Sequence, residues 1–184
     1  MPALLNLGHD PLHRYDPSGT YILDTRESHD RLPSLLTQWL RSDNEPTLWV
    51  INGPGSFSAM RSASVAVAML SYHHPGLTTL FLDKKTLYSY LFSKHIIEGP
   101  CYIYAGQLKS LLRLTRENSV IQSQTVPRSG LTPEPNARTD CIINTYTPRQ
   151  ITYIFDTVPL LEINGDRRDI HHLFIKGPII PSYR

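Results

Sequence analysis

The residues of this chain that could do chemistry are eight histidines, two cysteines and a few carboxylates. Two histidine pairs, His73-His74 and His171-His172, invite a metal-binding interpretation. Neighbouring side chains point about 100° apart on a helix and to opposite faces of a strand, so a pair rarely brings two imidazoles to one ion. No His-Glu-x-x-His motif occurs. The sequence therefore predicts no metal site, and it points to no cofactor.

Three aspartates stand near the ends of expected strands: Asp10, Asp24 and Asp83. A carboxylate in such a place could hold Mg²⁺ or activate water, which keeps an enzyme open as an alternative. Isolated aspartates near turns are more often caps or surface residues, and none of these three belongs to a recognisable motif. Ser56 lacks the Gly-x-Ser-x-Gly elbow of serine hydrolases, so catalysis by a serine has no support.

The segment Asn52-Gly-Pro-Gly-Ser56 stands between an expected strand, Leu48 to Ile51, and an expected helix, Phe57 to Tyr72. Its glycines allow a sharp turn with positive φ, Pro54 stiffens the corner, and Ser56 is placed to cap the helix. Free N–H groups at such a helix start can hold an anion. The lysine of a phosphate-binding P-loop is absent, so a structural corner is favoured over a phosphate site.

The elements that position this corner can be predicted from turns and periodicity. The spacing of Leu32, Leu36 and Trp39 predicts an amphipathic helix over Asp30 to Arg41, with Asp30 as its N-cap. Alternating strands and helices favour a mixed sheet with a parallel part, after an antiparallel start. The other expected elements of this half are strands at Ala3–Leu7, Leu12–Tyr15, Thr20–Thr25 and Leu77–Leu82 and a helix at Lys84–Phe92.

From Gly99-Pro100 onward the chain becomes rich in strands and turns, so we expect an N-terminal lobe, residues 1–99, and a smaller strand-rich lobe, residues 100–184. The prolines and the glycine of Pro127 to Thr139 predict a loop. The expected strands of this second lobe are Cys101–Tyr104, Ser110–Leu114, Ser119–Gln124, Cys141–Tyr146 and Ile151–Phe155.

Composition excludes several classes of protein. In 184 residues, the chain has 40% hydrophobic and 18% charged residues, which is typical of a folded domain. No apolar run reaches the roughly 18 residues of a membrane helix. Cys101 and Cys141 are far apart in sequence, which favours reduced thiols over a disulfide. We therefore expect a cytoplasmic protein that does not bind membranes.

The corner also resembles a known family. Gly53-Pro-Gly-Ser-Phe-Ser-Ala-Met-Arg61 resembles the Gly-Pro-Gly-Ser-Phe-Thr-Gly-Leu-Arg signature of the TsaB (YeaZ) family. His29-Asp-Arg-Leu32 resembles the His-Ser-Glu-Arg-Leu that opens the preceding helix of that family, and Pro178 to Arg184 is a looser echo of its ending. The resemblance is good from Ala3 to about Leu114. The family's Asp-Thr-Ser after the first strand is missing, because Leu5-Asn-Leu-Gly-His-Asp10 takes its place.

This resemblance implies an α/β fold of the actin, sugar-kinase and Hsp70 (ASKHA) type, with two lobes and a reduced second lobe. It also implies a non-catalytic scaffold in the biosynthesis of threonylcarbamoyladenosine (t6A) in tRNA. The implied partner is a TsaD-like catalytic protein, with a TsaE-like ATPase beside it and tRNA met only through the complex. A homodimer would form when the partner is missing.

Small and apolar residues cover much of the circumference of the expected Phe57–Tyr72 helix, which would let another helix approach closely. One set of residues is expected to contact the partner, and for each of them burial inside the lobe is the alternative: Leu36, Trp39, Met60, Ser64 and Val67. A second set forms the structural motif: Gly53, Pro54, Gly55, Ser56, Phe57 and Arg61.

Two other functions stay open. The chain could be a minimal ATPase or phosphotransferase, or a homologue of the M22-like peptidases inferred for this superfamily. It could also contact RNA directly, although sheet packing and ordinary surface charge are favoured for the residues concerned. Those residues are Arg113, Arg116, Arg128, Arg138, Arg149, Arg167, Arg168, Tyr102, Tyr104, Tyr146 and Tyr153.

Overall fold

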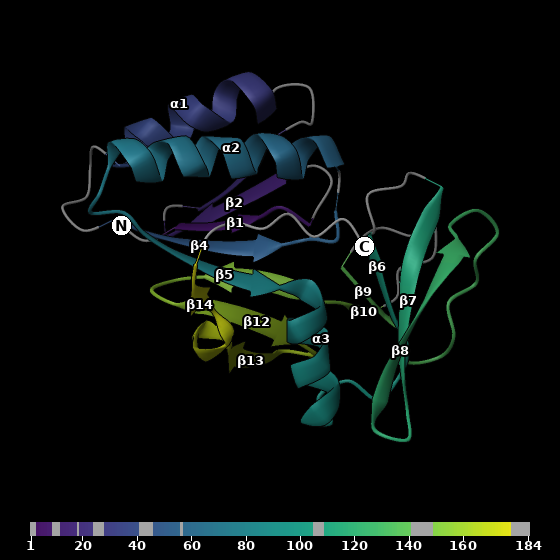
Figure 1. Cartoon of the computed structure of the whole chain (residues 1–184). Helices are drawn as coiled ribbons and strands as arrows, with labels where there is room; N and C mark the ends of the chain where they lie inside the picture. The colour runs from purple at the N-terminus through teal and green to yellow at the C-terminus, as the bar shows by residue number, and fades with distance from the viewer. Residues whose placement is uncertain are drawn as a thin grey trace.

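The computed structural model describes residues 3–8, 12–17, 19–23, 28–40, 46–55, 57–104, 109–140 and 149–177. These residues form a mixed α/β fold with three sheets, which confirms the predicted class. Figure 1 shows two helices stacked on one face of the first sheet, with the third helix and the strands of the C-terminal part on the other side. None of the described helices is long and apolar enough to cross a membrane.

The first sheet has the strand order β14-β5-β4-β1-β2-β3. Strands β1, β4 and β5 are parallel, whereas β1, β2 and β3 form an antiparallel meander, so both the antiparallel start and the parallel part are confirmed. The bounds are β1 Ala3–Asn6, β2 Leu12–Asp16, β3 Gly19–Leu23, β4 Thr47–Asn52, β5 Thr78–Asp83 and β14 Ile175–Lys176.

Helices α1 (Ser28–Leu40) and α2 (Phe57–His73) cover one face of this sheet. Alternate residues of the parallel strands point to that face, where Leu5 and Val50 pack with Leu36 and Met60. Helix α1 begins two residues before the predicted N-cap, Asp30, which therefore lies in the first turn. The other face is also buried, which explains why these strands have nearly continuous apolar sequences.

The opposite face of the sheet packs on helix α3 (Lys84–Ser93) and on the C-terminal half of the chain. Leu4 and Ile51 of the first sheet share one core cluster with Leu161 and Phe174. Strand β14 returns to the first sheet and pairs with β5. The division into residues 1–99 and 100–184 stays a prediction, since side chains from both stretches fill one core.

The second sheet has the order β10-β9-β6-β7-β8, and the third has the order β11-β12-β13. The predicted loop over Pro127 to Thr139 contains one short strand, β9, and the predicted strand Cys141–Tyr146 lies outside the described residues. The bounds are β6 Cys101–Tyr104, β7 Ser110–Glu117, β8 Val120–Pro127, β9 Arg138–Thr139, β10 Arg149–Gln150, β11 Thr152–Phe155, β12 Pro159–Ile163 and β13 Asp166–Asp169.

The glycine corner is buried between β4 and α2, and its Gly53-Pro54 peptide bond is cis. A Cβ atom on Gly55 would lie 2.6 Å from the Gly8 Cα atom and 2.6 Å from the Leu7 carbonyl oxygen. Gly55 is therefore required because the corner packs directly on the backbone that follows β1. Ser56, the predicted cap, lies outside the described residues.

Replacing Gly55→Ala should lower the free energy of unfolding by about 1–3 kcal/mol, because the new methyl group meets backbone atoms that cannot rotate away. Urea denaturation followed by circular dichroism measures this change. Gly76→Ala is the matched control, since a Cβ atom there has no heavy atom within 4 Å. Equal stability of the two variants would contradict this account of the corner.

Candidate functional site

The outer surface of α2 carries large exposed apolar side chains. The exposed fractions are 55% for Phe57, 53% for Val65 and 58% for Met69. Together with Arg61 and His73, these residues recur every four positions, so they follow one ridge of the helix. We call these five residues the α2 ridge. Exposed apolar side chains along one ridge, interspersed with basic groups, are typical of an interaction surface.

A groove with a volume of about 590 Å³ runs beside this ridge, between α1 and α2. Pro33 and Thr37 line it on the α1 side, whereas Ala66 and Leu70 line it from α2. No acidic side chain is present among the described residues that line it. The groove is therefore apolar, with positive charge from the α2 ridge.

The residues expected to contact a partner lie elsewhere. Leu36, Met60 and Val67 are buried in the core between the helices and the first sheet, so none of them can meet a partner in the folded chain. The half-buried Ser64 donates its hydroxyl to the Met60 carbonyl at 2.7 Å. The side chain of Trp39 lies outside the described residues. The alternative of burial inside the lobe holds for the three apolar residues.

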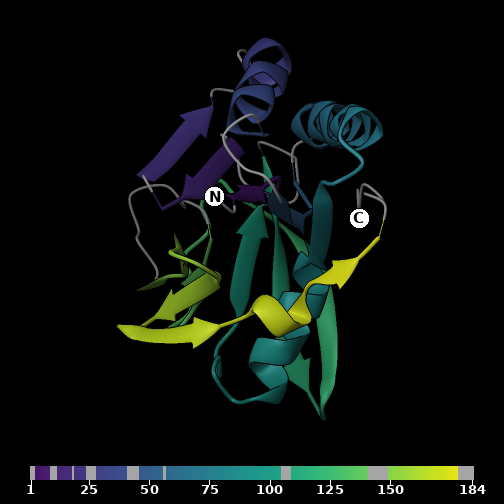
Figure 2. The same cartoon turned by 90° about the vertical axis from the view of Figure 1, so that its left-hand side faces the viewer.

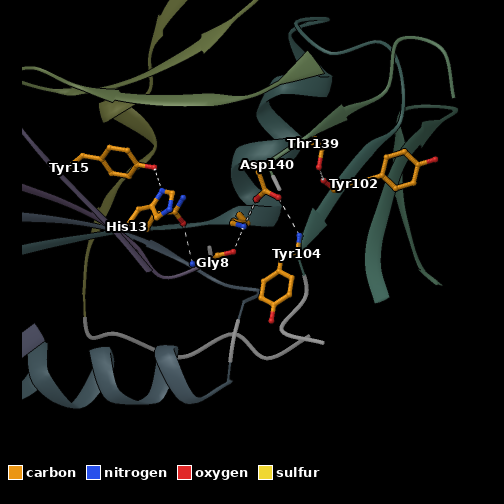
Figure 3. Close-up of polar contacts among 9 residues, drawn as sticks. Gly8, His13, Tyr15, Tyr102, Tyr104, Thr139 and Asp140 are labelled. Carbon is orange, nitrogen blue, oxygen red and sulfur yellow. Dashed lines mark hydrogen bonds and ion pairs between the residues drawn. The ribbon is translucent and has the colours of Figure 1, made fainter. Parts of the chain in front are cut away.

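A second candidate site is a buried ion pair at the carboxyl end of the parallel strands (Figure 3). Lys84 is fully buried at the start of α3, and its Nζ atom pairs with the Asp140 carboxylate and donates to the Gly8 carbonyl at 2.7 Å. The other Asp140 oxygen accepts from the Tyr104 N–H at 3.3 Å. The lysine thus ties α3 to the ends of β1 and β9.

Tyrosines surround this ion pair. The Tyr15 hydroxyl hydrogen-bonds the His13 Nδ1 atom at 2.8 Å. Burial, and secondarily the negative charge of Asp140, raises the pKa values of Tyr15, Tyr88 and Tyr153. The hydroxyls of Tyr88 and Tyr153 are buried and make no hydrogen bond to the described residues.

The charged groups of this cluster have a structural role. The Lys84 ammonium contacts the Asp140 carboxylate and a backbone carbonyl in the buried interior of the protein. A substrate group that is neutral or has the same charge would gain no interaction energy by replacing the ammonium or the carboxylate. A buried ammonium whose partners are satisfied is a poor nucleophile and a poor phosphate ligand. We interpret the cluster as a lock between the two halves of the core.

Of the three candidate carboxylates of an enzyme, the structure describes only Asp83. Asp83 caps α3 by accepting from the N–H groups of Lys85 and Thr86, at 2.8 and 3.2 Å. Asp10 and Asp24 lie outside the described residues. The sequence also contains one His-x-x-x-His spacing, His9 to His13, of which only the second residue is described. That histidine is on a strand.

The residues considered for RNA contact are mostly engaged in the fold. Tyr102, Tyr104 and Tyr153 are buried, so their rings cannot stack on bases. Arg113 forms an ion pair with Glu134 at 2.6 Å. The side chains of Arg149 and Tyr146 lie outside the described residues. Sheet packing, the alternative to base stacking, is what the structure shows for the three tyrosines.

Replacing Lys84→Met should lower the free energy of unfolding by about 3–5 kcal/mol, because it leaves the Asp140 carboxylate buried without its partner. Adding Asp140→Asn should restore part of the loss, since no uncompensated charge then remains. Urea denaturation of both variants measures this. Lys85→Met, at the exposed neighbouring position, is the control. The lock would be refuted if Lys84→Met and Lys85→Met were equally stable.

The buried tyrosines predict a loss of stability in alkali. Their raised pKa values mean that the folded chain holds these protons more tightly, so their contribution is complete below the ordinary tyrosine pKa of about 10 and falls as pH rises above it. Tyr153→Phe should reduce this fall by up to about 1.4 kcal/mol for each pH unit.

Urea midpoints measured between about pH 8 and pH 11 test this expectation. Tyr72→Phe is the control, because the side chain of Tyr72 is 83% exposed. Identical pH profiles for Tyr153→Phe and Tyr72→Phe would show that burial does not hold the proton.

Comparisons with known proteins show only a distant structural similarity. No protein-family model matches the chain, and neither does any curated protein. One similar solved structure is YeaZ from Pseudomonas aeruginosa, with 10% identity and a TM-score of 0.41, covering 75% of this chain and 74% of that chain. Another is an uncharacterized protein with similarity to peptidase YeaZ from the same organism, with 12% identity, a TM-score of 0.42 and the same coverage. Likenesses at this level decide neither family nor function.

Proposed function

We propose that this chain is a non-catalytic scaffold subunit for t6A formation in tRNA, and that it binds a TsaD-like catalytic protein through the groove between α1 and α2. The observation that carries the proposal is the open α2 ridge beside this groove. The resemblance of Gly53 to Arg61 to the TsaB signature supplies the family. A TsaE-like ATPase and tRNA would join through the partner.

The shape of the groove suits a helix. Its small side chains, Ser58, Ser62 and Ala66, allow a second helix to approach α2 closely, while Val65 and Met69 stand beside them as apolar anchors. Eleven of the described residues line the groove, whereas a stable interface of roughly 800 Å² has about 20–30 residues on each side. The partner must therefore extend beyond the groove onto the rest of α1 and α2.

The charge of the groove favours a distinct partner over a second copy. Arg61 and His73 line it, and the described lining carries no carboxylate to oppose them. Two copies meeting groove to groove would bring arginine near arginine, which disfavours self-association. We therefore expect the partner to present an apolar helix with aspartate or glutamate beside its apolar stripe.

Replacing Val65→Glu together with Met69→Glu should weaken binding of the TsaD-like protein from the same organism at least about tenfold, because charge would be buried against apolar surface. Sedimentation velocity with the purified proteins measures the dissociation constant. Val120→Glu on β8, where the side chain is 61% exposed, is the matched control and should bind normally.

Measuring the affinity of the unaltered chain for the partner at low and high salt tests the charge argument, since attraction to Arg61 should weaken as salt screens it. The chain alone should sediment as a monomer or as a weaker self-associated species. Normal binding by the folded double variant would overturn the docking surface. A tight homodimer that excludes the partner would contradict the proposal that the groove binds a different protein.

A further inference from the structure

The turn after β13 brings together one carboxylate and two imidazoles. Asp169, His171 and His172 each offer a ligand atom, and these atoms all lie within 4.8 Å of one another. All three side chains are exposed, so an ion from solvent can reach them. The residues belong to the end of β13 and to the single 3-10 turn His171–Leu173. This turn lies on the side of the first sheet away from α1 and α2 (Figure 1).

The turn is held in place by the core. Ile170 and Phe174, on either side of it, are buried with exposed fractions of 0% and 8%. The Leu173 N–H donates to the Ile170 carbonyl at 3.0 Å, and the Phe174 N–H donates to the His171 carbonyl at 3.1 Å. Anchors on both sides keep the three polar side chains on the surface and in one small region.

The side chains are also oriented before any ion arrives. The Asp169 carboxylate accepts from the His171 N–H at 2.8 Å and lies 2.7 Å from the His171 Nδ1 atom. The His172 ring packs edge-on against Tyr90, with ring centroids 5.3 Å apart. The two histidine rings are 5.9 Å apart. The ligand atoms of the two neighbouring histidines thus lie close together, although adjacent side chains diverge on a 3-10 turn as well.

We propose that Asp169, His171 and His172 form a surface site for a divalent transition metal ion such as Zn²⁺. Two imidazoles and a carboxylate are the nitrogen and oxygen donors that Zn²⁺ takes, at roughly 2.0–2.2 Å. Ligand atoms of a tetrahedral site are then about 3.4 Å apart. Because the three side chains are exposed, small rotations can bring their ligand atoms from within 4.8 Å of one another to this shorter spacing. Water completes the coordination.

A bound ion would stiffen the connection between two sheets. The turn carries the chain from β13 of the third sheet to β14, which pairs with β5 at the edge of the first sheet. Figure 2 shows this path, in which the short yellow helix stands between the strand arrows of β13 and β14. Holding the turn would therefore fasten β14 in place. This site is independent of the groove between α1 and α2.

Equilibrium dialysis of the chain, without a histidine tag, against Zn²⁺ tests the proposal. We expect one high-affinity ion for each chain and a higher melting temperature in its presence. His172→Ala should weaken the affinity at least about tenfold, and Asp169→Asn, which keeps the acceptor for the turn, should weaken it by a similar factor. Co²⁺ absorption reports the donor set of the unaltered chain.

His74→Ala is the matched control, since it alters the other histidine pair, which belongs to no comparable group of ligand atoms among the described residues. It should bind Zn²⁺ as the unaltered chain does. Circular dichroism verifies that each variant is folded. Absence of a stoichiometric ion would overturn the proposal. Equal affinity of His172→Ala and His74→Ala would overturn it as well.

Discussion

The buried ion pair between Lys84 and Asp140 is the interaction on which the arrangement of the chain depends. It joins the first residue of α3 to the segment after β9, and its third contact, with the Gly8 carbonyl, adds the end of β1. A charge left alone in such an interior costs several kcal/mol, so each partner requires the other. The pair therefore stabilises the packing of the two halves of the chain on one core, and the loss of either partner alone is costly.

The close packing around Lys84 also explains why two nearby residues are glycines. A Cβ atom on Gly8 would lie 2.2 Å from the Lys84 Cε atom, so any larger residue there would displace the lysine side chain. Gly55 in turn packs on Gly8. The corner, the end of β1 and the lysine therefore form one stack of close contacts. The glycine corner, whose sequence resembles a phosphate-binding turn, packs against other atoms of the same chain.

The N-terminal half of the fold could be predicted from the sequence because its signals are local. The glycine corner, the period of α1 and the apolar strands place α2, β4 and β5 close to where they lie. The strands after residue 150 were predicted only in part. Strand β13 is polar and fully exposed, and β14 has two residues, so neither shows an alternation that a pattern could detect.

The candidate site was harder to predict than the fold. Small residues around α2 hide which face is open, because a helix of alanine, serine and valine has little contrast between its sides. Met60 and Val67 were therefore expected to contact a partner, although they are buried and Val65 and Met69 face solvent. The repeat of Phe57, Arg61, Val65 and Met69 at intervals of four, with no acidic residue, was the signal available.

Strand β14 has a consequence for the order in which the chain is built. Ile175 lies opposite Phe81 in the first sheet, although the two residues are far apart in the sequence. As the chain emerges from the ribosome, β5 is therefore synthesised long before the segment that covers its free edge. During that interval the strand presents unpaired backbone groups and depends on other protection from association. Closing the edge requires a contact of long range, which forms slowly.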